Sequence, residues 1–155
     1  MIDAEVLVES KQWKKIIQNP KRIVLNILSR FPIKYKFINK KVYISILLTN
    51  NKKIKLLNNK FRKKNKATDI LSFPLKKKIS KNIIYLGDII ISYDFMNKPK
   101  SLNILEFKIK VVKIFIHGFL HLIGFNHIKD TEFKKMNEEE LKIYNLVKKK
   151  FENFA

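Results

Sequence analysis

All three histidines of the chain fall within one eleven-residue stretch, from His117 to His127. His117 and His121 are four positions apart, so on a helix their imidazoles lie on the same face, one turn apart. Gly124 follows three residues after His121 and can end that helix in a left-handed turn, which brings His127 back to the same point. Three neutral imidazoles with an open fourth position are the ligands of a catalytic zinc site. We therefore expect one zinc ion per chain, bound by His117, His121 and His127.

The alternative is that the three histidines are packed helix residues without a ligand. A lone histidine on an apolar face favours that interpretation, but this chain has three at ligand spacing and none elsewhere. Clustered buried imidazoles also need separate hydrogen-bond partners. The chain has no cysteine, so disulfides and thiolate ligands are excluded and a metal site must use His, Asp or Glu.

The charge of the chain favours a polyanionic partner. It has 155 residues, 34 basic and 13 acidic, for a net charge of +21, and nucleic acid is the first candidate for its partner. Only Arg22, Arg30 and Arg62 are arginines. The excess of lysine, isoleucine and asparagine is also what a biased genome composition produces, so the charge supports RNA or DNA binding without proving it. Because the chain has 155 residues, we expect one domain over residues 1–155. Hydrophobic residues make up 46% of it, which argues against disorder.

The sequence gives no indication of export or membrane insertion. The first ten residues carry three acids and lack the basic region that opens a secretory signal. The most apolar segment, residues 111–125, is too short to span a bilayer and is interrupted by Lys113 and two histidines. We expect a soluble, cytoplasmic protein with no membrane partner.

Apolar periodicity predicts the elements that position the histidines. Strands are expected at residues 2–8, 42–48, 68–73 and 83–92. Helices are expected at residues 13–31, 52–61, 102–123 and from Asp130 or Thr131 to the last lysines of the chain. The third of these helices is apolar almost all round, as a central buried helix is, and it carries His117 and His121. The predicted fold class is an α/β sandwich with a small mixed sheet of about four strands surrounded by helices.

Local signals refine this prediction. Pro20 should break or restart the first helix, and Thr49 or Asn50 should cap the second. Pro74 should end the third strand, leaving residues 76–82 as a polar connection. Gly87 inside the fourth strand suggests a bulge or a close backbone approach. Of the remaining candidates, Asp69 is expected to support a strand edge or to cap a turn, and Asp88 to fix the bulge. Phe61, Phe73 and Phe125 are expected to pack in the core rather than to stack on bases.

The histidine spacing alone resembles that of the metzincin zinc peptidases. Those enzymes need a glutamate directly after the first histidine as general base. In this chain that position is Gly118, and the motif contains no acidic residue. A zinc peptidase is therefore a poorly supported alternative.

A second resemblance covers most of the chain. The stretch His117-Gly-x-Leu-His-Leu-x-Gly-Phe-Asn-His127 resembles the signature of the YbeY family of endoribonucleases and ribosomal RNA maturation factors. Upstream, residues 57–74, which include Phe61-Arg62 and Thr68-Asp69-Ile70-Leu71-Ser72-Phe73-Pro74, resemble the second family block, and Leu86-Gly87-Asp88-Ile89 resembles the third. Two positions depart from the family pattern: Asn126 replaces the usual aspartate before the third histidine, and Ala67 replaces a common proline.

The resemblance implies a zinc-dependent, single-strand-specific endoribonuclease. It implies a role in maturing ribosomal RNA, chiefly the small-subunit 3′ end, and in ribosome quality control, with the ribosome or its associated factors as partners. It also implies that His117, His121 and His127 bind zinc and that Arg62 is a functional residue.

The chemistry agrees with that implication. Phosphodiester cleavage requires positive charge where the transition state becomes negative, and a guanidinium provides it in a bidentate geometry. We expect His117 and Arg62 to be catalytic, with Arg62 also binding the substrate. The main alternative is a non-enzymatic ribosome-assembly factor that binds ribosomal RNA and in which the metal is structural.

Overall fold

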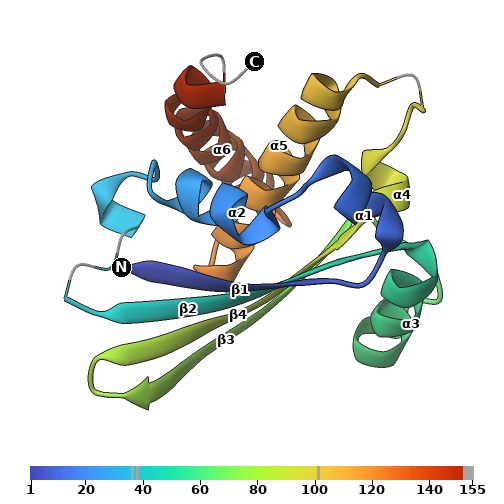
Figure 1. The fold of residues 1–155 in the computed structure, drawn as a ribbon. Coiled ribbons are helices and arrows are strands. Elements are labelled where there is room, and N and C mark those ends of the chain that lie inside the picture. The colour runs from blue at the N-terminus through green and yellow to red at the C-terminus, as the bar shows by residue number, and fades with distance from the viewer. Residues whose placement is uncertain (36, 38, 101, 152–155) are drawn as a thin grey trace.

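A four-stranded sheet lies at the base of the fold, and most of the helices cover one of its faces (Figure 1). This computed structural model describes residues 1–35, 37, 39–100 and 102–151. The strands are β1 (Ile2–Val8), β2 (Lys41–Thr49), β3 (Ile70–Ser80) and β4 (Ile83–Ser92). The helices are α1 (Lys11–Ile16), α2 (Pro20–Leu28), the 3₁₀ helix η1 (Ile33–Tyr35), α3 (Asn51–Arg62), α4 (Tyr93–Met96), α5 (Ile104–Leu122) and α6 (Asp130–Phe151). The predicted fold class, a small sheet with surrounding helices, is confirmed.

The sheet is mixed, with the strand order β1-β2-β4-β3. β1, β2 and β4 are parallel, and β3 pairs with β4 in the antiparallel direction at one edge. Side chains alternate between the two faces along each strand. In β2 the residues that point to the main helical layer are all buried: Val42, Ile44, Ile46 and Leu48.

The third strand is longer than predicted. β3 continues through Pro74 to Ser80 and forms a hairpin with β4, so the prediction that Pro74 ends the strand and that residues 76–82 are a polar connection is wrong. Pro74 is tolerated because β3 is an edge strand, where a missing N–H can be accommodated. The register shifts between Pro74 and Lys77, and Lys76 has a positive φ of 45°, so the interruption is a bulge inside the strand.

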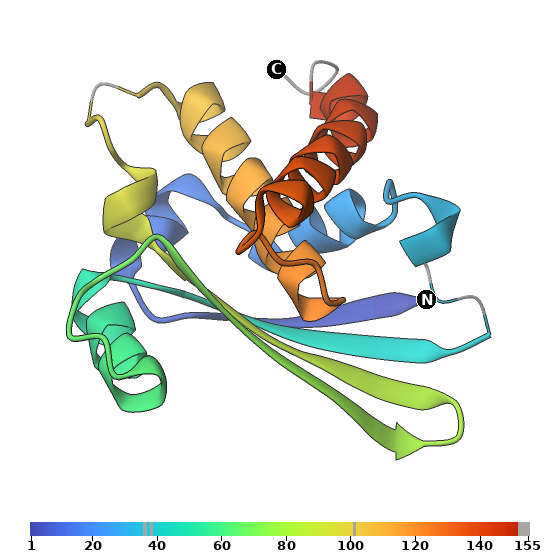
Figure 2. The ribbon, with the colours of Figure 1, turned by 180° about the vertical axis from the view of Figure 1, so that it is seen from behind.

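The central helix α5 lies over the sheet and carries the largest part of the core. Figure 2, the view from behind, shows α5 and α6 crossing each other above the strands. Phe119 of α5 is fully buried, and its ring packs edge-on against Phe31 at 4.8 Å between centroids. Trp13 is also buried and donates its indole N–H to the carbonyl of Thr49 at 2.8 Å. Burial of each such side chain stabilises the fold by about 1.5–3 kcal/mol.

The predicted helix boundaries are largely confirmed. Pro20 separates α1 from α2, and the Asn19 side chain caps α2. Of the two candidates for the cap of α3, Asn50 is the one that accepts a hydrogen bond, from the backbone N–H of Lys53 at 3.0 Å. A capping box of Asn103 and Glu106 begins α5, which satisfies two exposed donors at its first turn.

Helix α3 covers the opposite face of the sheet at one end. Its Ile54 is buried with Leu71 of β3 and Ile90 of β4 in a second, smaller core cluster. This packing places the C-terminal end of α3 beside β3. None of the helices in the described ranges combines the length and apolar character that a membrane crossing requires.

Candidate metal centre

The end of α5 is built as the sequence predicts. Gly124 has a φ of +107°, a conformation that favours glycine. Its N–H donates to the carbonyl of His121, and the N–H of Phe125 donates to the carbonyl of Leu120. These two bonds are those of a Schellman motif. The motif ends the helix at Leu122, directly after His121, and turns the chain back toward it.

The turn brings the three histidines together, as predicted. One ring nitrogen from each of His117, His121 and His127 lies within 4.8 Å of the others. The Nε2 atoms of His117 and His121 are 3.1 Å apart. Two nitrogens that each lie about 2.0–2.1 Å from one tetrahedral ion are separated by roughly 3.3 Å, so His117 and His121 already have the separation of two zinc ligands, and the imidazole of His127 completes a set of three nitrogen donors of the kind that zinc binds.

His121 is prepared to act as a neutral ligand. Its Nδ1 lies 2.9 Å from the carbonyl oxygen of Phe125, so Nδ1 carries the proton and donates it to that oxygen. Nε2 is then the nitrogen with the free lone pair. Burial lowers the pKa of His121, and the nearby His117, His127 and Arg62 lower it further, against the opposing effect of the Phe125 carbonyl. His121 is therefore neutral at physiological pH.

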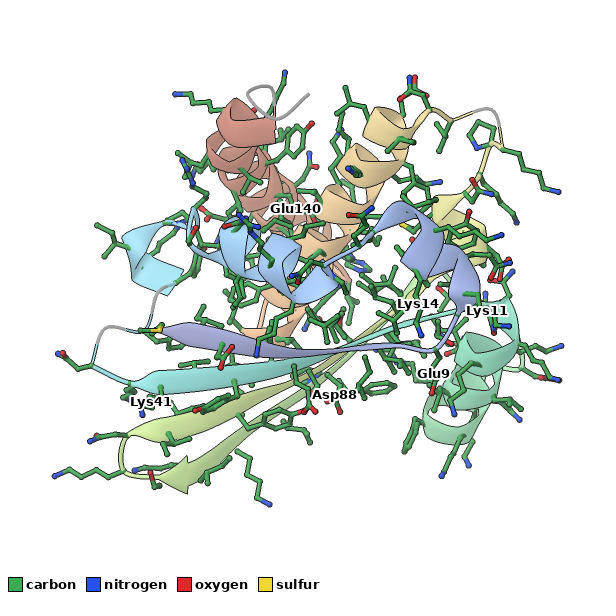
Figure 3. The ribbon with its side chains drawn as sticks, viewed as in Figure 1. Glu9, Lys11, Lys14, Lys41, Asp88 and Glu140 are labelled. Atoms are coloured by element: carbon green, nitrogen blue, oxygen red, sulfur yellow. The ribbon has the colours of Figure 1, made fainter. Side chains whose placement is uncertain are left out.

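A carboxylate from α6 orients His117. Nδ1 of His117 lies 2.5 Å from Oε1 of Glu140, and both side chains are about 28% exposed. Figure 3 shows Glu140 on α6, in the helical layer beside α5. An acceptor on Nδ1 fixes the proton there and turns Nε2 toward the centre, as in the carboxylate–histidine–metal arrangement of known sites. Glu140 was not predicted as a site residue. The acidic run 138–140 in a basic chain was its only sequence signal.

The neighbouring Glu139 anchors α6 against the rest of the helical layer. Its carboxylate accepts hydrogen bonds from Tyr35, at 2.6 Å, and from Lys34, at 2.9 Å. Burial raises the pKa of Glu139, but the hydrogen bonds from Lys34, Tyr35 and Lys142 outweigh that effect and bring the pKa to about 2. The charged carboxylate therefore holds α6 in the position that presents Glu140 to His117.

Arg62 lies close to the centre from another direction. The predicted helix ended at residue 61, but Arg62 is the last residue of α3, and the left-handed Lys63 ends the helix. Nη2 of Arg62 donates to the backbone carbonyl of Ser72 at 2.8 Å, and its Cζ lies 5.4 Å from the centroid of the Phe73 ring. The hydroxyl of Ser72 in turn donates to the carbonyl of Gly118 at 3.2 Å. The positive charge of Arg62 also contributes to the lowered pKa of His121.

An open cleft of about 350 Å³ adjoins the metal centre. His117 and Glu140 form one side of it, and Lys110, Lys113 and Asp69 also line it. The carboxylate of Asp69 accepts hydrogen bonds from the Thr68 hydroxyl and from the N–H of Ile70, in keeping with its predicted local role. Of the three histidines, His117 lines this cleft, so a molecule bound in the cleft reaches the His117 side of the centre.

A family model described as endoribonuclease YbeY matches residues 7–148. The chain belongs to the YbeY family. The endoribonuclease YbeY of Pelagibacter ubique (strain HTCC1062) is 59% identical over 151 residues, which cover 97% of this chain and 99% of that protein. The endoribonuclease YbeY of Ehrlichia canis (strain Jake) is 39% identical over 140 residues, covering 90% of this chain and 89% of the relative.

A solved structure has a similar fold. The solution structure of a protein from Thermotoga maritima superposes with a TM-score of 0.57 at 24% identity, covering 100% of this chain and 94% of that one. At this identity the likeness supports the fold alone.

The geometry explains why this YbeY chain has no peptidase-type base after its first histidine. A Cβ on Gly118 would lie 2.5 Å from Cδ1 of Ile70 and 3.0 Å from Oγ of Ser72. The position therefore faces the sheet at the point where α5 crosses β3. A glutamate there would be directed into the sheet and away from the imidazoles, which argues against metzincin chemistry.

The other residues singled out in the sequence are Asp88 and three phenylalanines, and they differ in their contacts and burial. Asp88, labelled on the sheet in Figure 3, accepts a hydrogen bond from the Tyr85 hydroxyl. It follows the bulge at Gly87, where the pairing with β2 skips Leu86, as predicted. Phe125 and Phe73 are partly buried against the core clusters, whereas Phe61 is exposed, so the prediction of core packing is wrong for Phe61.

Proposed function

We propose that the chain is a zinc-dependent endoribonuclease that cleaves unpaired RNA. The observation that carries the proposal is the convergence of three imidazoles, two of them with Nδ1 held by an acceptor, beside the guanidinium of Arg62. Membership of a family whose relatives are named endoribonuclease YbeY supports it. The family resemblance extends the proposal to ribosomal RNA maturation, chiefly at the small-subunit 3′ end, to ribosome quality control, and to ribosomal partners in the cytoplasm. We treat residues 1–155 as one catalytic domain.

His117, His121 and His127 would hold the zinc ion through their ring nitrogens. When bound, the ion supplies Lewis acidity that activates water and polarises a phosphoryl oxygen. The protein contributes the orientation of these ligands. Glu140 and the Phe125 carbonyl each hold the Nδ1 proton of one imidazole. The nitrogens that face the centre are thereby kept unprotonated.

Arg62 provides the positive charge at the reacting phosphate. Its guanidinium is fixed by Ser72 and Phe73, so it needs little reorganisation when negative charge develops in the transition state. Surface lysines hold the flanking phosphates by charge alone. Asn126 cannot serve as a base, so proton removal from water does not depend on a carboxylate within the histidine motif.

The second candidate function is that of a non-enzymatic factor that binds ribosomal RNA. The net charge of +21 favours RNA binding in either case. A structural zinc site usually has four protein ligands. In the described part of the chain the ligand group at this centre consists of three histidines, which supports a catalytic role over a structural one.

Arg62→Ala separates the enzyme from the binding protein. We expect this variant to lose single-turnover cleavage of unpaired RNA by about a hundredfold or more, because one placed charge is removed from the transition state. It should keep its metal content and most of its RNA affinity, since one phosphate contact among many contributes little to binding. Arg62→Lys should rescue poorly, because lysine lacks the planar fork.

Arg22→Ala on α2 is the matched control, since it removes the same charge from an exposed position on a helix. Cleavage by Arg62→Ala at the wild-type rate would remove Arg62 from the mechanism. Tight RNA binding by pure wild-type protein without any cleavage would favour the assembly factor.

A further inference from the structure

The last turn of α3 presents an aromatic ring to solvent on a basic surface. Phe61 is 58% exposed, although its burial would stabilise the fold. Lys60 precedes it and Arg62 follows it. Lys63, Lys64 and Lys66 of the next loop are exposed, and within the described residues none of these three side chains takes part in an ion pair. An exposed ring among free cations is the combination that binds single-stranded nucleic acid.

The ring is held in place before any ligand arrives. It packs edge-on against Phe73, with 5.4 Å between centroids and 62° between the planes. Phe73 is itself partly buried against the cluster of Ile54, Leu71 and Ile90. Nζ of Lys60 lies 5.3 Å from the centroid of the Phe61 ring. Because Phe61 is already ordered, a base that stacks on it loses little of the interaction to side-chain ordering.

A short series of contacts joins this ring to the metal centre. Phe73 contacts both the Phe61 ring and the guanidinium of Arg62. Arg62 is bonded to the carbonyl of Ser72, and the Ser72 hydroxyl is bonded to Gly118, the neighbour of His117. The exposed ring therefore lies one side chain away from the charge assigned to the reacting phosphate.

We propose that Phe61 is a base-stacking subsite for a nucleotide that flanks the cleaved phosphate in unpaired RNA. The proposal rests on the proposed nuclease function and deepens it by naming a source of single-strand selectivity. An unpaired base can turn its free face onto the ring, whereas a base within a duplex already has both faces stacked. The subsite is tolerant of sequence, since every base has such a face.

The same helix offers a matched control. Leu56 is 61% exposed on α3, so Leu56→Ala removes an apolar surface of similar exposure without removing an aromatic face. Phe61→Leu keeps an apolar contact for Phe73 and loses the ring. Phe61→Trp keeps an aromatic face. Circular dichroism and metal content establish that each variant is folded and loaded.

The experiment uses the full, metal-loaded chain and an unpaired RNA that contains 2-aminopurine, whose fluorescence falls when the base stacks. Stopped flow records binding before cleavage, and the same RNA annealed to its complement is the duplex reference. We expect Phe61→Leu to weaken binding of the unpaired RNA by about tenfold and to abolish the quenching, in line with the effect of removing a stacking ring. Binding of the duplex should be unchanged, and Phe61→Trp and Leu56→Ala should behave as wild type.

The outcomes distinguish this proposal from the nuclease assignment. Equal losses for unpaired and paired RNA, quenching that persists in Phe61→Leu, or no RNA binding by the wild type would each overturn the subsite. Cleavage by the wild type with no dependence on Phe61 would overturn the subsite and leave the nuclease standing. Quenching that depends on Phe61 without cleavage would support the subsite and count against the nuclease.

Discussion

Nδ1 of His117 and Nδ1 of His121 each donate a hydrogen bond to an oxygen, and these two bonds leave the Nε2 atoms to face the centre. The acceptor for His121 is the carbonyl of Phe125, within the same turn. The acceptor for His117 is Glu140, which is 23 residues away and on another helix. The convergence of the three histidines could be predicted because it depends on one helix and one glycine. Glu140 could not, because its position depends on how α6 packs against α5.

Removal of the Glu140 carboxylate should weaken metal binding. Glu140→Ala frees the His117 ring to rotate and to place its proton on either nitrogen, so we expect the dissociation constant for zinc to rise by about 10- to 100-fold. Glu140→Gln should lose less, because its amide oxygen can still accept from Nδ1. Competition with a chromogenic chelator measures the constants.

Glu138→Ala is the control for charge, since Glu138 is an exposed residue of the same acidic run. Equal zinc affinities for wild type, Glu138→Ala and Glu140→Ala would show that Glu140 does not position His117.

At the scale of elements, local signals predicted the helix ends but not the full length of β3. Gly124 and Asn50 act within their own turns, so their roles follow from the sequence. Pro74 was expected to end a strand, but the pairing of β3 with β4 continues past it at a bulge. Pairing with a neighbouring strand outweighs a local preference and is not visible in the segment itself.

Gly87 is a position of β4 at which the pairing with β3 is sensitive to substitution. It has a φ of +142°, and a Cβ there would lie 2.1 Å from the backbone oxygen of Phe73. We expect Gly87→Ala to lower the free energy of unfolding by at least about 2 kcal/mol, since backbone strain alone costs about 1–3 kcal/mol. For a domain of this size that corresponds to a fall in Tm of about 4–8 °C.

Gly124→Ala provides the comparison. Gly124 also has a positive φ, but among the described residues its added Cβ would meet only Nζ of Lys76, at 3.2 Å, so the fall in Tm should be smaller. Thermal unfolding followed by circular dichroism measures both variants. A larger fall for Gly124→Ala than for Gly87→Ala would contradict the assignment of the close approach.

At the scale of the whole molecule, the site is assembled from distant parts of the chain. α5 and its following turn supply the histidines, α6 supplies Glu140, and the end of α3 supplies Arg62. The sequence predicted the class of fold and the order of its elements. It could not show which helix ends meet, because that depends on packing on both faces of the sheet.

The excess of lysine over the whole surface should make RNA binding strongly dependent on salt. Each phosphate that the protein neutralises contributes about 0.7 to the slope of log affinity against log salt for single strands. With a net charge of +21, we expect several such contacts and a slope of about 2 or more. Fluorescence anisotropy with unpaired RNA at 50–200 mM salt measures it, and an affinity that does not change over this range would contradict the prediction.

The most direct test of the account is removal and return of the metal. Protein as purified should contain about one zinc per chain by elemental analysis, and it should cleave unpaired RNA. Dialysis of the wild-type protein against a chelator should abolish cleavage, and addition of one equivalent of zinc should restore its cleavage activity. His121→Ala should contain no stoichiometric zinc and should stay inactive after zinc is added. Full cleavage by the stripped protein, or full zinc occupancy in His121→Ala, would contradict the account.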